Sequence, residues 1–156
     1  MAIHIRRREF IFTLGGAAAA WPLAARAQQP AMPVIGFLDA TTAADTAYRV
    51  SAFRDGLKEA GFIDGHNVAI EFRWAENKLD RLPALSADLA QRQVAVIVGP
   101  HQTMRAVQAA TSTIPIVFVS GGDPTESGLV TNVSRPGGNI TGLSFGSASL
   151  QPKRLG

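Results

Sequence analysis

The sequence feature that most restricts the fold is a series of short, continuous apolar runs separated by helix-like segments. Three of the runs are rich in β-branched residues and end at turn residues: 34–38 (VIGFL), 94–98 (VAVIV) and 115–119 (PIVFV). Runs of this length between turn signals are typical of strands that are covered on both faces, as they are in a parallel sheet. The sequence therefore predicts buried parallel strands at these three positions.

Two further strands are predicted. Residues 67–74 (NVAIEFRW) alternate, with apolar side chains at every second position from Val68 to Trp74. This alternation predicts a half-exposed strand, which we expect at an edge of the sheet. Residues 140–145 (ITGLSF) are predicted to form the fifth strand.

Three helices are predicted between these strands from apolar residues at intervals of three and four. The residues expected to face the core are Val50, Phe53, Leu57 and Ala60 in the first, Leu79, Leu82, Leu85 and Leu89 in the second, and Val107 and Ala110 in the third. Gly61 can end the first helix, and Pro83 is tolerated only in the first turn of the second. The third helix is expected over 102–110.

The alternating order of strands and helices defines the expected fold class. Strand–helix–strand units form right-handed crossovers and place their strands in parallel. We therefore expect an α/β fold: a mostly parallel open sheet, Rossmann-like or flavodoxin-like, with helices on both faces. The length of 156 residues leaves room for one such domain, and 46% apolar residues can supply its core.

The first 27 residues have the layout of an export signal. Three arginines at 6–8 precede a mildly apolar run at 10–20, and 25–27 (ARA) fits a cleavage site. Within this segment 7–11 (RREFI) resembles a twin-arginine signal. The apolar run is shorter than the ~20 residues that a membrane-spanning helix needs. The sequence thus predicts export to the periplasm and cleavage near Ala27.

The net charge of the chain is concentrated in this leader. The formal net charge is +3, from 15 basic and 12 acidic residues. Residues 1–27 hold four of the basic residues and one of the acidic ones, so the mature domain at 28–156 has 11 of each. A balanced surface supplies little of the counterion release that drives nucleic-acid binding, so no nucleic-acid partner is expected. Cysteine is absent, which excludes disulfides, thiolate metal sites and a cysteine nucleophile.

Candidate binding residues lie where the first, third and fourth predicted strands end. In an open parallel sheet, ligands collect at the carboxyl ends of the strands, near the point where the strand order reverses. These ends are 39–42 (DATT), 99–103 (GPHQT) and 120–123 (SGGD), and their glycines let the backbone approach a ligand closely. Each loop alone also fits a plain strand–helix turn, but three loops at one edge favour a ligand groove. The candidate ligand-binding residues are Asp39, Ala40, Thr41, Gly99, His101, Gln102, Ser120, Gly121 and Asp123.

No catalytic residue, metal site or cofactor is predicted. Residues 142–146 (GLSFG) match the pattern of a nucleophile elbow, but no Asp, Glu or His follows Ser144 to complete a triad. His66 lies in a segment of turn composition and is expected to be solvated, whereas His101 lies at a strand end and could contact a ligand. Neither has a metal-ligand spacing to another histidine, and the glycine motifs of nucleotide binding are absent.

Six segments together resemble one known family. They are 33–38 (PVIGFL), 53–65 (FRDGLKEAGFIDG), 67–74, 96–100, 114–124 (IPIVFVSGGDP) and 129–143, which ends in SRPGGNITGL. These segments are similar to the ABC transporter substrate-binding proteins of the tryptophan/tyrosine-uptake-like group. Members of that group are exported solute-binding proteins with a type I periplasmic-binding-protein fold, and many carry a leader of the same kind.

The resemblance implies two α/β lobes that close on a small, amino-acid-like solute and deliver it to an ABC permease in the inner membrane. It also implies that the loops at 39–42, 99–103 and 120–123 hold the ligand. Members of the family continue with a second lobe after the fifth strand, so 28–156 is expected to represent a truncated protein, the N-terminal lobe alone. One lobe presents half of a cleft, and weak or absent binding is expected of this chain by itself.

Two other functions stay open from the residues. An exported α/β enzyme would use Asp39 and Asp123 as carboxylates at neighbouring strand ends, although loop capping also explains both residues. A ligand-sensing module of a membrane receptor would share the same fold. The resemblance favours the solute-binding component of an importer, and no enzymatic activity is expected of such a protein.

Overall fold

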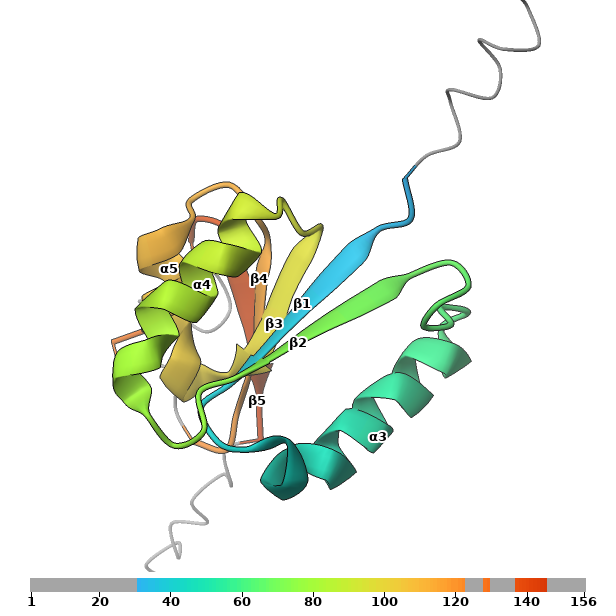
Figure 1. The fold of residues 1–156 in the computed structure, drawn as a ribbon, viewed down its shortest axis with the longest axis horizontal. Helices are drawn as coiled ribbons and strands as arrows, with labels where there is room; N and C mark the ends of the chain where they lie inside the picture. Colours follow the sequence, from blue (N-terminus) through green and yellow to red (C-terminus); the bar gives the residue numbers. More distant parts are fainter. Residues whose placement is uncertain (1–30, 123–127, 130–136, 146–156) are drawn as a thin grey trace, which may run out of the picture. The chain divides into compact units, whose positions relative to one another are not determined.

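The computed structural model describes residues 31–122, 128–129 and 137–145. Within them, the strands of one sheet are β1 (Val34–Asp39), β2 (Ala69–Trp74), β3 (Val96–Pro100), β4 (Ile116–Ser120) and β5 (Ile140–Ser144). The α-helices and 3-10 turns are α3 (Ala43–Glu59), η1 (Leu79–Arg81), α4 (Leu82–Gln91), η2 (His101–Thr103) and α5 (Met104–Ala110). Figure 1 shows α3 on one side of the sheet and α4 with α5 on the other.

The strand order is β2-β1-β3-β4-β5, and every neighbouring pair is parallel. The register places Ile35 of β1 between Ile70 of β2 and Val96 of β3. The predicted parallel α/β fold is thereby confirmed. The alternating segment forms β2, which lies at an edge of the sheet as predicted.

The side of the sheet that carries α4 and α5 holds the main hydrophobic core. Alternate residues of each strand point to this side, and Leu38, Ile97 and Ile116 are fully buried there. Gly36 also faces it, since a Cβ at this position would lie 3.0 Å from a side-chain methyl of Leu89 in α4. The absence of a side chain at Gly36 therefore lets α4 pack directly on β1.

On the opposite side, α3 covers β1 and β2 through an aromatic cluster. The Phe37 ring of β1 lies 5.5 Å from the ring of Phe53 in α3 and 5.5 Å from that of Phe72 in β2. Phe72 in turn stacks on Trp74, with ring centroids 5.3 Å apart. The Trp74 Nε1 donates a 2.9 Å hydrogen bond to the hydroxyl of Thr46, which is fully buried in α3. These contacts fix α3 over the first two strands.

The same side of the sheet carries no helix over β3, β4 and β5 in the described part of the chain. The register places Val119 and Leu143 on this side, where they are 41% and 61% exposed. Phe118 and Ile140 point to the other side and are 3% and 5% exposed. The lack of a helix on this side follows from the right-handedness of the strand–helix–strand connections. The step from β1 to β2 runs one way along the sheet and every later step runs the other way, so the later connections lie on the opposite side from α3.

Two predicted core residues prove to be exposed. Leu79 is 64% exposed because it lies in the 3-10 turn η1, before α4 begins. Ala60 is exposed because α3 ends at Glu59 and Ala60 forms its C-terminal cap. For these residues the prediction was wrong, since the periodic pattern extends past the ends of the real helices.

The ends of the helices follow the glycine and proline signals more closely than the periodicity. Gly61 follows α3 with a φ of +85°, and Pro83 lies in the first turn of α4, as predicted. The third helix is shorter than predicted: residues 101–103 form a 3-10 turn, and the α-helix begins at Met104, which is fully buried.

A network of four charged side chains ties α4 to β2. Nη2 of Arg73 lies 2.8 Å from Oε2 of Glu71 and 2.7 Å from Oδ2 of Asp88. Arg92 completes the network, 3.3 Å from Glu71 and 3.2 Å from Asp88. The hydrogen bond from Arg73 and then that from Arg92 lower the pKa of Asp88 below its usual value of 3.8.

We expect this network to make the stability of the protein fall in acid. The folded-state pKa of Asp88 lies below the unfolded value, so its stabilising contribution is complete above the unfolded pKa and is lost as the pH falls through the lower folded value. Asp88→Asn should therefore lower the urea midpoint more at about pH 6 than at about pH 2. Urea unfolding followed by circular dichroism measures both midpoints.

Asp80→Asn is the matched control for this prediction. Asp80 lies exposed in η1 and has no ion-pair partner among the residues that the structure describes. Its substitution should change the two midpoints equally. If Asp88→Asn lowered the urea midpoint equally at both pH values, the result would contradict the role assigned to the network.

Candidate functional site

The carboxyl ends of β1, β3 and β4 lie side by side, because these strands are neighbours and run in the same direction. The predicted loops at 39–42 and 99–103 and the residues that follow β4 therefore share one edge of the sheet. The chain leaves β1 for α3 on one side of the sheet and β3 for α5 on the other (Figure 1). A crevice forms at such a switch point, where open α/β sheets bind their ligands.

A groove with a volume of about 430 Å³ lies at this switch point. The predicted binding residues that line it are Asp39, Gly99, His101, Gln102 and Gly121. All three predicted loops thus contribute to one groove. His101 is half-buried and Gln102 is exposed, so both side chains border the open part of the groove.

The other predicted binding residues do not line the groove. Ala40 and Ser120 are 5% and 2% exposed, and the hydroxyl of Ser120 donates to the carbonyl two residues further along the chain at 2.9 Å. Thr41 donates from its backbone N and its hydroxyl to Oδ1 of Asp39, each at 2.9 Å. These bonds shape the loops beside the groove. Asp123 lies outside the described residues.

The groove has a second wall that sequence reasoning missed, because this wall comes from α3. Its residues occupy one strip of the helix, at positions i, i+1, i+4 and i+5: Tyr48, Arg49, Ala52 and Phe53. The floor is apolar and comes from β1, β3 and β4: Phe37, Val98 and Val119. The spacing within α3 is the sequence signal that could have found this wall.

The main electrostatic feature of the groove is a buried ion pair. The Asp39 side chain is 0% exposed, and its Oδ2 lies 3.2 Å from Nη2 of Arg49, whose side chain is 36% exposed. Oδ1 of Asp39 accepts the two hydrogen bonds from Thr41. In contrast, Asp39 Oδ2 and Arg49 Nε are both buried without a hydrogen-bond partner in the described structure. The pair is therefore not fully satisfied within the lobe, which is energetically unfavourable for buried charged groups.

Gly99 is required at the groove for a steric reason. A Cβ at this position would overlap the backbone oxygen of Leu38 in β1 and would lie 3.0 Å from Met104 at the start of α5. A side chain here would push apart the ends of β1 and β3, between which the groove opens. The absence of a side chain at Gly99 thus lets β1 and β3 pack closely and also leaves the groove open to a ligand.

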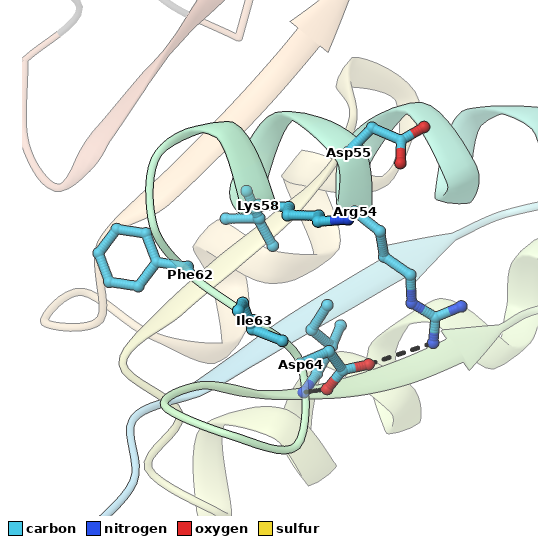
Figure 2. A pocket seen from close by; sticks show the side chains of 8 residues that line it. Arg54, Asp55, Lys58, Phe62, Ile63 and Asp64 are labelled. Carbon is cyan, nitrogen blue, oxygen red and sulfur yellow. Dashed lines mark hydrogen bonds and ion pairs between the residues drawn. The ribbon is translucent and has the colours of Figure 1, made fainter.

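A second cavity, of about 200 Å³, lies between the C-terminal part of α3 and the loop before β2. Figure 2 shows Arg54 reaching from α3 to Asp64 of that loop, with Nη2 and Oδ2 3.2 Å apart. Asp64 also accepts a 3.1 Å hydrogen bond from the backbone N of Ile70, and the Arg54 guanidinium lies 4.9 Å from the Phe72 ring. Because these charged groups satisfy each other, the larger groove at the switch point is the better candidate site.

Ser144 and His66, which were not assigned to a site from the sequence, are not among the residues that line the groove. Ser144 ends β5, and its hydroxyl donates to the carbonyl of Gly122 at 2.7 Å; a nucleophile elbow would place the serine on a strand-to-helix turn. His66 is exposed in the turn after α3, as expected.

In the described ranges, no three acidic, histidine or cysteine side chains gather as a metal site would require. No helix in those ranges is long and apolar enough to cross a bilayer.

An open parallel lobe with a groove at its switch point has the architecture that α/β proteins use to bind ligands. The chain belongs to the ABC transporter substrate-binding protein family, whose model matches residues 33–154. The family resemblance inferred from the sequence is thereby confirmed.

Known relatives of the chain are substrate-binding proteins. The tyrosine-binding protein of Clostridioides difficile (strain R20291) is 31% identical over 93 residues, which cover 59% of this chain and 27% of that protein. The ligand-free, open structure of a substrate-binding protein with adhesive properties from Clostridium difficile matches with a TM-score of 0.66 and 27% identity. A structure from Streptococcus pneumonia in complex with L-Trp matches with a TM-score of 0.63 and 29% identity. Both structural matches cover 72% of this chain and 38% of the solved chain, so this chain spans less than half the length of these relatives.

Gly99→Ala should destabilise the protein by about 1–3 kcal/mol, because the added methyl group overpacks the ends of β1 and β3. Gly56→Ala in α3 is the control, since a Cβ there would meet nothing within 4 Å. That substitution should stabilise the helix by about 0.5–1 kcal/mol. Chemical denaturation measures both changes, and equal stability of the two variants would refute the steric role of Gly99.

Proposed function

We propose that this protein is the solute-binding component of an ABC importer and that it binds a small, amino-acid-like solute in the groove at the switch point. The observation that carries the proposal is the position of the groove, where the loops after β1, β3 and β4 meet. Membership of the substrate-binding family supports the same conclusion. Of the predicted residues that line the groove, Gly99, His101, Gln102 and Gly121 are assigned to the solute, whereas the Asp39 side chain is 0% exposed and shapes the groove wall.

The groove suits a small molecule with an apolar body. Its volume of about 430 Å³ lies within the ~300–1,000 Å³ that is usual for small-molecule sites. Phe37, Val98 and Val119 provide apolar surface, and His101 and Gln102 provide polar groups at the rim. A relative named as a tyrosine-binding protein and a similar structure in complex with L-Trp support an aromatic amino acid as the first solute to test.

We place the protein in the periplasm, where it passes its solute to an ABC permease of the inner membrane. The support is the sequence of the first 27 residues, in which an arginine pair, an apolar run and a cleavage site occur in the order of an export signal. The family to which the chain belongs supports the permease as partner.

The lobe is proposed to act together with a second lobe that completes the cleft. The solved relatives are longer, since this chain covers 38% of their length. The exposed Val119 and Leu143 lie on the side of the sheet that right-handed connections between β2 and β5 cannot cover. Chain from outside the described residues that packs on this side beyond the groove would bury Leu143, whereas Val119 belongs to the groove floor.

The test is an NMR titration of the purified protein with L-tryptophan and L-tyrosine. Binding should shift the backbone amide resonances of Gly99, Gln102 and Gly121, while those of Phe62 and Ile63 beside the second cavity stay in place. An open groove encloses less than the ~70–90% of a ligand that closed sites bury, so the titration extends into the millimolar range.

Gln102→Ala and Gln91→Ala form a matched pair for this test. Gln102 lines the groove, whereas Gln91 lies exposed at the end of α4. Loss of a hydrogen bond should weaken binding about twofold to tenfold in Gln102→Ala and leave it unchanged in Gln91→Ala. Equal effects of the two substitutions would contradict the site, and the absence of shifts up to the millimolar range would contradict binding of an aromatic amino acid by this lobe.

A further inference from the structure

Arg49 differs from Arg54, Arg73 and Arg92 in how its guanidinium is used. Those three arginines donate hydrogen bonds to carboxylates at the surface. Arg49 lies 3.2 Å from the carboxylate of Asp39, but neither its Nε nor the Oδ2 of Asp39 has a hydrogen-bond partner within the described structure. A guanidinium carries five N–H donors, and although Nε is buried the Arg49 side chain is 36% exposed, so its exposed part keeps donors for a partner that the lobe itself does not supply.

The two members of the pair differ in their access to the groove. Asp39 is 0% exposed and already accepts two hydrogen bonds from Thr41, so a solute cannot reach its carboxylate without moving it. The Arg49 side chain is 36% exposed and lines the groove. A solute therefore meets the guanidinium first, and the group that complements its planar set of donors is a carboxylate.

We infer that Arg49 binds the carboxylate of the solute and that Asp39 is a positioning residue that holds Arg49 at the groove wall. Thr41 fixes Asp39 at the end of β1, and the Tyr48 ring lies 5.8 Å from the guanidinium carbon. The inference rests on the proposed function and assigns separate roles within the same groove.

The rest of the lining defines the class of solute. Phe37, Phe53 and Val98 offer apolar surface in the groove that Arg49 borders. Asp39 balances the charge of Arg49, so the pair has no excess of positive charge with which to attract a polyanion. The chemistry that fits is a monocarboxylate or zwitterion with an apolar or aromatic body.

Three indole compounds separate the groups that the solute presents. L-tryptophan has a carboxylate and an ammonium group, indole-3-propionate keeps only the carboxylate, and tryptamine keeps only the ammonium group. In Arg49→Gln the affinity for the first two should fall about tenfold or more, as expected when a charge-assisted hydrogen bond is lost. The affinity for tryptamine should not fall. NMR titration of the purified protein measures all three affinities.

Two further variants control for charge and for position on the helix. Arg54→Gln removes an arginine of the same helix whose side chain is 50% exposed and paired with Asp64, and it should leave all three affinities unchanged. Arg49→Lys keeps the charge but not the planar set of donors, and it should recover part of the lost affinity. Because Arg49→Gln leaves a buried carboxylate unpaired, the double variant Asp39→Asn/Arg49→Gln is measured beside it as a form without either charge.

The positioning role of Asp39 has its own readout in the Nε–Hε resonance of Arg49. In the unmodified protein this resonance should move when L-tryptophan or indole-3-propionate is added and stay in place with tryptamine. In Asp39→Asn the resonance should shift toward that of a solvated arginine, and the affinity for the two carboxylates should fall while that for tryptamine is kept. A merely structural role for Asp39 would lower the affinity for all three compounds alike.

The outcomes separate this inference from the proposed function. Unchanged affinity for L-tryptophan and indole-3-propionate in both Arg49→Gln and the double variant overturns the inference and leaves the proposed function intact. A loss of affinity that is equal for tryptamine also overturns it, because the effect is then not specific to the carboxylate. Failure of the unmodified protein to bind any of the three compounds overturns the inference and contradicts binding of an aromatic amino acid by this lobe.

Discussion

The fixed handedness of strand–helix–strand connections determines where this lobe can bind a ligand. Because the chain steps from β1 to β2 in one direction and from β2 onward in the other, α3 lies on one side of the sheet and α4 with α5 on the other (Figure 1). The chain therefore diverges after β1 and β3, and the groove opens where it does so. The same rule leaves one side of β3, β4 and β5 without a helix from the described connections, and Leu143 is 61% exposed there. One topological constraint thus accounts for both the binding groove and the uncovered apolar surface.

The strands could be predicted from the sequence because interior and edge strands leave different local signals. The interior strands are apolar at consecutive positions, as 94–98 and 115–119 are, whereas the edge strand within 67–74 alternates. The pattern predicts cover on both faces, but in the described structure one side of β3 and β4 carries no helix, and Val119 is 41% exposed there. The limits of the helices leave a weaker signal. Leu79 fits the spacing of α4, yet the chain forms a 3-10 turn there and Pro83 occupies the first turn of the helix that follows. Periodicity indicates which residues can share a face, but it does not fix the residue at which a helix begins.

The part of the candidate site that lies at the strand ends could be predicted from the order of strands and helices along the chain. Parallel strands carry their carboxyl ends at the same edge, so Asp39 and Gly99 could be placed together without coordinates. The wall from α3 could not be found in this way, because Tyr48 and Arg49 lie beside the stripe of the helix that contains Val50 and Phe53, and that stripe was expected to face only the core. A search for the buried face passes over residues beside it. The four-residue spacing of the wall residues becomes informative only once the strand order shows which side of the helix borders the switch point.

The ion pairs of the described structure differ in how completely their hydrogen bonds are made, and the difference follows their location. The network around Asp88 and the pair of Arg54 with Asp64 lie at the surface and are hydrogen-bonded. The pair of Asp39 with Arg49 contains the most buried carboxylate and is the least satisfied. Removing two charges from water offsets most of their attraction, so a buried pair that lacks hydrogen bonds contributes little to the stability of the lobe. Stability alone therefore does not explain why this pair lies at the groove, whereas a carboxylate that arrives with the solute would supply an acceptor for the exposed part of the Arg49 guanidinium.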